Sequence, residues 1–418
     1  MKRKQPTEEP ALLRVFKASG EELASIPTDD VVNVQDLKQR LEGLCGLPRF
    51  RQRLLHENVD LEDHVKLESA MDLQLVLLGF ISASAEQEEE LTAVAGSGDV
   101  PQLERILQRP QCPDIGANSE EEDETPLCYA SSEGHGDAVR LLLEARADAN
   151  APNGEGDRPL LLASIHCHPE IVDLLLGARA DMDVCGSDEE TPLYLAAAEG
   201  HLDVACLLLR ARADLEATNY DEETPLFTAC EFGQQALVAL LLRARADPNA
   251  RDVNGRTPIL AACVENHPKI VRLLLQAMAE TGLAEPPLCV AARLGRLKVV
   301  RVLLAARAEL EARDSTGMTP LSVACAGDEV RVAMALLQAR AALEARDHLG
   351  QTPLWHATDV RGGVRLARLL LEAGARRNIS NRYGHTLRQK LAARGSIQIL
   401  RLLSNRRILR MPRKETSP

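Results

Sequence analysis

Residues 191–217, TPLYLAAAEGHLDVACLLLRARADLEA, contain the pattern that decides how most of this chain folds. Thr191-Pro192 suits the start of a helix, because a Thr hydroxyl can accept from a free amide and Pro needs no amide partner in the first turn. Small and apolar residues follow at helical spacing, Gly200-His201 interrupts them, and a second apolar stripe begins at Val204. The stretch predicts a hairpin of two short helices.

The same pattern recurs along the chain at an interval of about 33 residues. The other copies begin at Thr125, Arg158, Thr224, Thr257, Pro286, Thr319 and Thr352. One hairpin cannot bury both of its apolar faces, so the copies must stack on one another. Pattern and period resemble the ankyrin-repeat family over roughly three quarters of the chain. The resemblance implies an α-solenoid of stacked ankyrin repeats with degenerate capping repeats at its ends.

A different pattern, with alternating apolar residues, precedes the repeats. The expected elements are strands at 12–18 and 23–26, a helix at 34–45, and strands at 51–55 and 73–77. The segments RQRLLHENVDLED (51–63) and DLQLVLL (72–78) are similar to a strand-turn segment and the last strand of ubiquitin. This resemblance implies a small N-terminal α+β domain with the β-grasp, ubiquitin-like fold.

These patterns predict five parts of the chain. They are a disordered N-terminus at 1–10, a ubiquitin-like domain at 11–80, an acidic junction at 81–90, the ankyrin-repeat solenoid with its capping repeats at 91–405, and a basic tail at 406–418. Between Met278 and Pro286 the chain is about four residues shorter than at other repeat junctions. We therefore expect a missing or cramped turn there, and a notch or bend that divides the stack into two blocks.

Composition argues against metal and cofactor chemistry. The ten cysteines show no close-paired spacing, and Cys230, Cys263 and Cys325 share one repeat position, which predicts small buried side chains in reduced form. The run His166-Cys167-His168 suggests zinc. However, His168 belongs to a histidine column whose members are one repeat apart, too far to share an ion. We expect no metal and no cofactor.

The charge distribution and the termini indicate the compartment and exclude some partners. The first residues, MKRKQPTEEP, lack the apolar core of a secretory signal, and no apolar run is long enough to span a membrane. We therefore expect a cytoplasmic protein, with the nucleus as the alternative because of the basic start. The net charge is −13, yet basic residues dominate from Arg361 onward. This basic region lacks interleaved aromatics and reader motifs, so it does not predict nucleic-acid binding.

Two columns depart from the family pattern. The His of the family's Thr-Pro-Leu-His is replaced in every copy, by Cys128, Leu161, Tyr194, Phe227, Leu260, Cys289, Ser322 and Trp355. Packing must then replace the hydrogen bonds of that His. The Gly after the second helix is Arg at 146, 179, 212, 245, 307 and 340, where a left-handed backbone costs a non-glycine residue about 1 kcal/mol. We expect strain there; an arginine ladder for anions is the alternative.

The family resemblance implies that a partner binds on the concave side, at the turn tips and at the two residues before Gly-His. Tyr220, Phe227 and Phe232 concentrate the scarce aromatics in one repeat, and acidic tips flank them. This favours a protein partner that presents a basic segment with an apolar anchor. The predicted partner-binding residues are Asp188, Glu199, Tyr220, Asp221, Glu222, Glu231, Phe232 and Glu265. The alternative is a solvated acidic edge with aromatics that fill the stack.

These observations favour a non-enzymatic, monomeric interaction scaffold that binds no small-molecule substrate and no membrane. The alternative is a ubiquitin-pathway adaptor whose N-terminal domain engages the degradation machinery. Leu55 and Val76 occupy two positions of ubiquitin's apolar patch, but Ala18 replaces the large third residue, and no diglycine end follows. No nucleophile elbow, phosphate loop or kinase motif predicts an enzyme. Asn150 and Asn249 are expected to be structural, with side-chain hydroxylation as the alternative implied by the family.

Overall fold

The structure, a computed structural model, describes residues 11–80, 83–109, 111–114, 124–282, 285–359 and 363–404. The predicted N-terminal segment 1–10 and the tail 406–418 lie outside these residues. The chain forms two compact units. The first unit consists of Met1–Leu195 and Cys206–Ala213, and the second of Ala196–Ala205 and Asp214–Pro418.

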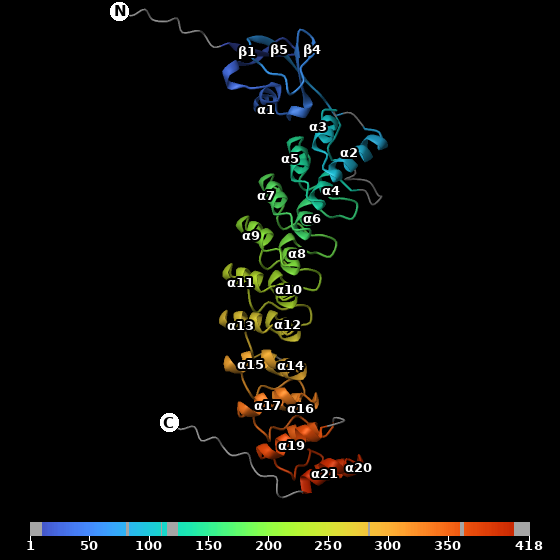
Figure 1. The fold of residues 1–418 in the computed structure, drawn as a ribbon, viewed down its shortest axis with the longest axis vertical. Coiled ribbons are helices and arrows are strands. Elements are labelled where there is room, and N and C mark those ends of the chain that lie inside the picture. The colour runs from blue at the N-terminus through green and yellow to red at the C-terminus, as the bar shows by residue number, and fades with distance from the viewer. Residues whose placement is uncertain are drawn as a thin grey trace, which may run out of the picture. The chain divides into compact units, whose positions relative to one another are not determined.

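The first unit begins with a domain in which one helix packs on a five-stranded mixed sheet (Figure 1). Its main elements are β1 (Leu12–Lys17), β2 (Glu22–Pro27), α1 (Val34–Cys45), β3 (Gln52–His56), β4 (Val59–Asp60) and β5 (Met71–Leu77), with 3-10 turns η1 (Thr28–Asp30) and η2 (Arg49–Arg51). The strand order is β2-β1-β5-β3-β4, with β1 and β5 parallel and the other neighbours antiparallel. The expected α+β class is confirmed.

The buried face of this sheet follows from the alternation of residues along its strands. Its core consists of Leu13, Val15, Val31, Val34, Leu37, Leu41, Leu54, Leu67, Leu73 and Leu75. The short strand β4 is absent from the predicted elements. It pairs with β3 across Glu57 and Asn58, which both have positive φ. Asn58 was a usable signal for this turn, because Asn enters the left-handed region more readily than most residues.

Helix pairs follow in the first unit. They are α2 (Ala85–Ser97) with α3 (Val100–Leu107), α4 (Pro126–Ser132) with α5 (Gly136–Glu144), and α6 (Pro159–Ile165) with α7 (Pro169–Gly177). First helices contact first helices of the next pair, and second helices contact second helices. Helix α2 begins at Ala85, because Ser84 and Gln87 form a capping box. Most of the segment predicted as an acidic junction is therefore helical.

The pair α8 (Pro192–Glu199) and α9 (Leu202–Arg210) contributes to both units, and further pairs build the second unit. These are α10 (Pro225–Glu231) with α11 (Gln235–Arg243), α12 (Pro258–Val264) with α13 (Pro268–Gln276), α14 (Pro287–Arg293) with α15 (Leu297–Ala305), α16 (Pro320–Ala326) with α17 (Val330–Gln338), α18 (Pro353–Ala357) with α19 (Val364–Ala373), and α20 (Leu387–Ala393) with α21 (Ile397–Ser404). Stacked helix pairs after an N-terminal α+β domain are the predicted fold class.

The expected division of the stack between Met278 and Pro286 is not found. Helix α12 contacts α14 and α13 contacts α15 across this junction, and all four helices lie in the second unit. The short junction therefore keeps the neighbouring pairs in register, because the helix contacts do not depend on the turn loop. A groove does lie between α13 and α15.

The Thr-Pro starts form helix caps as predicted in only some copies. The hydroxyls of Thr125, Thr191, Thr224 and Thr319 accept from the amide three residues on. Thr257 and Thr352 form no such bond, and their hydroxyls are buried without a partner in the described structure. Their φ values of −109° and −101° differ from the −78° and −83° of Thr125 and Thr224, so the backbone turns the hydroxyl away from the amide.

The residues that replace the family's His are buried, so packing does take its place. Phe227 is 1% exposed, and Tyr194 and Trp355 are 6% and 5% exposed. Side chains at a different repeat position, directly before the second helix, nevertheless form hydrogen bonds between repeats. In several pairs the residue before the second helix donates to a carbonyl at the end of the preceding first helix, as in His135 to Gly96 (3.0 Å) and His267 to Glu231 (3.1 Å). The expectation that packing alone links the repeats is therefore too narrow.

Two further features of the turns connect neighbouring repeats. The Oδ1 atoms of Asn150 and Asn249 accept from the amides of Asp181 and Glu280, each at 2.8 Å. These bonds support the structural interpretation of both asparagines. Gly233 has φ +80°, and a Cβ atom there would lie 2.6 Å from the ring of His267. A glycine is therefore required where the first helix ends and the next repeat's side chain crosses it.

The predicted left-handed arginines are confirmed, since Arg146, Arg179, Arg212, Arg245, Arg307 and Arg340 have φ between 60° and 74°. We expect Arg179→Gly to raise the free energy of unfolding by about 0.5–1 kcal/mol, because glycine removes the left-handed penalty and loses only a weak helix-end charge interaction. Thermal unfolding measures this change. Arg179→Ala keeps the Cβ atom and should give no gain; a lower melting temperature for the glycine variant would contradict the strain.

Candidate functional site

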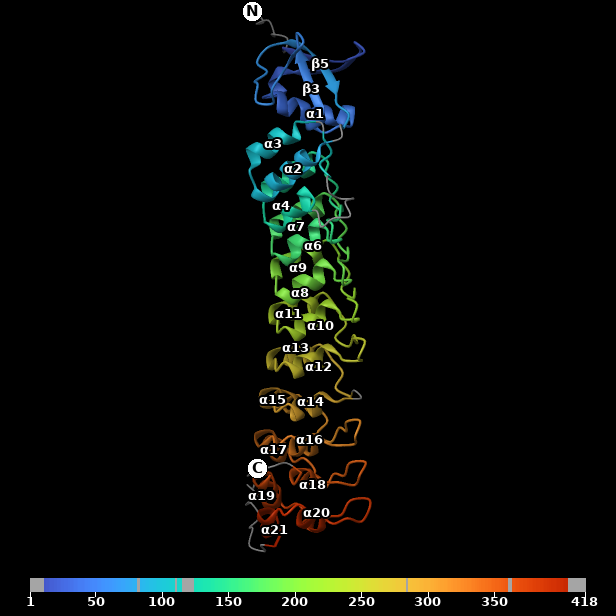
Figure 2. The same ribbon diagram turned by 90° about the vertical axis from the view of Figure 1, so that its right-hand side faces the viewer.

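Most residues predicted to bind a partner lie on one surface of the second unit, formed by turn tips and by the ends of first helices. Figure 2 shows these turn loops on one side of the helix pairs within that unit. We call it the turn-side surface; it comprises Tyr220, Asp221, Glu222, Glu231, Phe232, Val253, Arg256 and Glu265. Glu199 is an exposed residue of the second unit, and Asp188 is an exposed residue of the first unit.

Two aromatic side chains of the turn-side surface are open to solvent. Tyr220 is 81% exposed at a turn tip, and Phe232 is 60% exposed directly after α10. Phe227 comes only five residues before Phe232 but is buried in the stack. The aromatic cluster seen in the sequence therefore separates into two exposed side chains and one core residue. Aromatic side chains often anchor protein interfaces, so these two exposed rings are candidates for a binding role.

Hydrogen bonds within the turns hold these tips in place. The Oδ1 atom of Asn219 accepts from the amides of Asp221 (3.1 Å) and Glu223 (2.9 Å). Asp252 does the same for the next turn, and the amide of Val253 donates to the carbonyl of Asp221 at 3.0 Å. The two neighbouring turns are thus joined through their backbones. Tyr220 and Val253, which is 58% exposed, stand on a fixed scaffold.

A cluster of carboxylates around one cation lies beside these tips. Arg256 contacts Asp252 at 2.6 Å, Glu223 at 3.2 Å and Glu231 at 3.8 Å. Its guanidinium also lies 5.2 Å from the centre of the Phe227 ring. The Asp252 side chain is fully buried, which explains why it requires the nearby cation. Arg256 therefore organises the cluster from its centre.

This cluster remains short of positive charge. Burial raises the pKa of Glu231, the charge of Glu223 raises it further, and Arg256 opposes both effects; Glu265 and Asp252 also raise it. Three carboxylates thus contact a single guanidinium, Glu265 adds a fourth negative charge near Glu231, and the exposed Asp221 and Glu222 add two more at the tip. A cation from another molecule would relieve this repulsion.

The negative surface ends at the following repeat. Arg293 occupies the position of Glu231 within that copy's first helix, and it pairs with Glu285 at 2.7 Å and with Asp314 at 3.5 Å. These contacts neutralise the local charge. Val253, Asp252 and Arg256 are functional candidates that the sequence interpretation omitted. A signal for Arg256 existed, because the same column holds Glu124, Glu190 and Glu223 in other copies.

The N-terminal domain exposes the sheet face that carries Leu55 and Val76. Both residues are half-buried and alternate with the core residues Leu54 and Leu75. A hollow of about 250 Å³ on this face is lined by Ala18, Leu55 and Gln74 among other residues, but Val76 is not one of them. The structure therefore joins Leu55 with Ala18 in one hollow and leaves Val76 beside it.

The helix side of the same domain contacts the first helix pairs. The Arg49 side chain is 1% exposed and pairs with Asp63 (2.7 Å), Glu104 of α3 (2.8 Å) and Glu144 of α5 (2.6 Å). Its pKa is raised by the hydrogen bonds and charges of Glu144 and Glu104, which outweigh the opposing effect of burial. Gln39 also donates to Glu144, and Arg146 pairs with Glu42. A buried arginine thus connects the domain to the repeats.

The described residues form neither a metal site nor a membrane-spanning helix. No group of three or more His, Cys, Asp or Glu side chains is arranged to hold a metal ion among the residues that the structure describes. In the same residues no helix is both long and apolar enough to cross a membrane. The three cysteines of the shared repeat position are buried and free, as predicted.

Comparison with protein families gives a match over most of the chain. A model described as ankyrin repeats in three copies matches residues 91–184, 167–252, 193–285, 241–314 and 288–381. These overlapping matches extend from residue 91 to residue 381, more than two thirds of the 418 residues. They include every residue of the turn-side surface and begin after the N-terminal α+β domain.

Proposed function

The chain belongs to the ankyrin-repeat family, and from that premise we propose that it is a non-enzymatic scaffold that binds a partner protein at the turn-side surface. Ankyrin repeats imply a role in protein interaction, and the choice of surface and partner is our own inference. The partner presents a basic segment that carries an exposed apolar side chain. The apolar side chain lies against Tyr220 and Phe232, and the basic groups face the carboxylates around them.

The observation that carries this proposal is the pairing of two exposed aromatic rings with an excess of negative charge. Tyr220 and Phe232 are far more exposed than aromatic residues of a folded core, and the fold does not need them for packing. The neighbouring Glu231 has a raised pKa, which marks a site where an added cation is favourable. Apolar anchors supply affinity, whereas complementary charge selects the partner and accelerates its association.

A variant with both Tyr220→Ala and Phe232→Ala is expected to lose partner binding. Each aromatic anchor of an interface commonly contributes 2 kcal/mol or more, so affinity should fall by at least about 30-fold. Affinity capture from cell extract with the full chain, followed by mass spectrometry, compares the variant with the native protein. Tyr383→Ala removes an equally exposed aromatic beside Arg382 and serves as the matched control. Equal recovery of every protein by native and double variant would refute the site.

A second candidate is a ubiquitin-pathway adaptor that acts through an N-terminal domain of ubiquitin-like type. The contact of Arg49 with Glu104 and Glu144 supports it, since this contact uses the helix side and leaves the sheet face with Leu55 open. The small Ala18 in the hollow beside Leu55 argues against strong recognition. Binding of the full chain to proteasomal ubiquitin receptors, abolished by Leu55→Glu, would favour this candidate over the first.

A further inference from the structure

The outward-facing charge of the second helices reverses along the chain. In the first unit, α5 and α7 carry Asp137, Glu170 and Asp173 on their first two turns, and the one cation there, Arg140, pairs with Asp137 and Glu170. In the second unit the corresponding positions of α13, α15, α17, α19 and α21 are mostly basic. They are occupied by Lys269, Arg272, Lys298, Arg301, Arg331, Arg365, Arg368 and Arg401. Glu372 is the sole acidic residue of these five helices.

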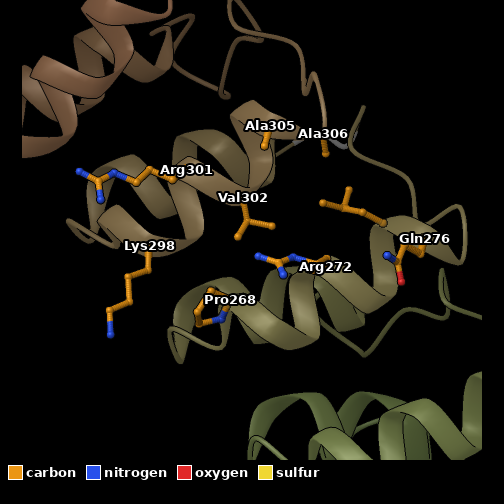
Figure 3. Close-up of a pocket in the computed structure, with 9 residues that line it drawn as sticks. Pro268, Arg272, Gln276, Lys298, Arg301, Val302, Ala305 and Ala306 are labelled. Carbon is orange, nitrogen blue, oxygen red and sulfur yellow. The ribbon is translucent and has the colours of Figure 1, made fainter.

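A groove interrupts this basic row between α13 and α15, at the short repeat junction (Figure 3). Its volume is about 590 Å³, within the range of sites that hold a few side chains of a ligand. The apolar floor consists of Pro268, Leu275, Val302, Ala305 and Ala306, and the polar rim consists of Arg272, Gln276, Lys298 and Arg301. Figure 3 shows Val302 of α15 and Arg272 of α13 directed into the space between the helices.

Some basic residues of the second unit are paired with carboxylates, whereas in the described structure the rim cations are not. Arg256 and Arg293 have carboxylate partners within the repeats, and Arg394 pairs with Asp359. Within the described part of the chain, Arg272, Lys298 and Arg301 form no ion pair, and all three are exposed. Three unpaired cations therefore border an apolar floor. A ligand that combines carboxylates with an apolar side chain matches both features.

We propose that this groove is a second docking site, for an acidic segment of a partner protein that carries an apolar side chain among its carboxylates. The guanidinium groups of Arg272 and Arg301 suit carboxylates because each can donate two parallel hydrogen bonds. The apolar side chain packs against Leu275 and Val302. The site lies on second helices, has the opposite charge to the turn-side surface, and does not depend on the function proposed for that surface.

Other anionic partners fit the groove less well. Single-stranded nucleic acid relies on aromatic side chains for base stacking, and the groove has none. An anionic membrane favours apolar side chains that project outward, whereas Leu275 and Val302 are partly buried between the helices. The groove thus selects by both charge and shape, and a peptide chain is the ligand that supplies the two together.

The test uses the full chain and a fluorescein-labelled peptide, Glu-Glu-Leu-Glu-Asp-Leu-Glu-Glu, in an anisotropy titration at physiological ionic strength. One variant combines Arg272→Glu, Lys298→Glu and Arg301→Glu. The matched control combines Lys269→Glu, Arg331→Glu and Arg365→Glu, which reverses the same number of exposed charges on the same row outside the groove. We expect the first variant to bind the peptide at least tenfold more weakly, and the control at most threefold more weakly. Circular dichroism confirms that both remain folded.

Two comparisons complete the experiment. A peptide with Ser in place of both Leu residues should bind the native chain several-fold more weakly, since it cannot use the apolar floor. Equal losses for the two triple variants would show diffuse attraction without a groove site and overturn the proposal. It would equally be overturned by no binding of the Leu-containing peptide, or by tighter binding of a single-stranded oligonucleotide or of phosphatidylserine vesicles.

Discussion

Arg49→Ala is expected to lower the stability of the N-terminal domain and of its contact with the repeats by about 3–5 kcal/mol, the cost of removing one partner from a buried ion pair. Arg49 is almost fully buried and lies between Asp63, Glu104 and Glu144. Its loss leaves these carboxylates close together without their common cation. The guanidinium also stacks on Phe50 at 4.0 Å, and that contact disappears as well.

Hydrogen exchange in increasing urea measures this effect, read from amides of α1, α3 and α5. The matched control is Arg53→Ala, since Arg53 is half exposed and pairs only loosely with Asp60 at 3.4 Å. That variant should cost less than about 1 kcal/mol, as exposed ion pairs do. Equal behaviour of the two variants would mean that the Arg49 contact does not connect the domain to the repeats.

Phe227→Ala is expected to lower the free energy of unfolding of the second unit by about 3–5 kcal/mol, because it leaves a large cavity in the stack. The Phe227 ring is 1% exposed, and the Arg256 guanidinium lies 5.2 Å from the centre of this ring. Each repeat buries much of its apolar surface against its neighbours. A cavity in α10 therefore also weakens the repeats on either side. Phe232→Ala removes the same side chain five residues later and should change stability by less than about 0.5 kcal/mol.

The fluorescence of Trp355, the single tryptophan of the chain, reports unfolding of this unit because the ring is buried. The two phenylalanine variants form a matched pair, since one changes the core and the other changes the surface. If Phe232→Ala destabilised the unit as much as Phe227→Ala, Phe232 would be a packing residue. Its place in the turn-side surface would then be lost.

The repeats were predictable because their pattern is local and recurs. Thr-Pro starts, Gly-His breaks and a stripe of Leu residues fix each hairpin within about 33 residues, and stacking is the only way to bury both faces. The left-handed arginines were equally predictable, since a helix end imposes that backbone on whichever residue follows it. Strand β4 was missed because two residues are too few for a periodic signal.

Contacts between segments distant in sequence could not be predicted. Arg49 meets Glu144 across 95 residues, and nothing near either residue indicates the pair. Which of the clustered aromatic residues are buried also depends on the fold. Phe227 is buried in the stack, whereas Phe232 follows the end of the same helix and is exposed. The groove between α13 and α15 lies at the short junction and is bordered by Arg272, Lys298 and Arg301. The sequence indicated the short junction but not the groove.

Photo-crosslinking from position 220, with p-benzoylphenylalanine in place of Tyr220 in the full chain, shows which partner segment lies against the turn-side surface. The peptide captured from cell extract is identified by mass spectrometry, and position 383 serves as the control site. We expect a crosslinked peptide rich in Lys and Arg with an apolar residue, obtained from position 220 and not from 383. An acidic peptide, or the same products from both positions, would contradict the proposed binding at this surface.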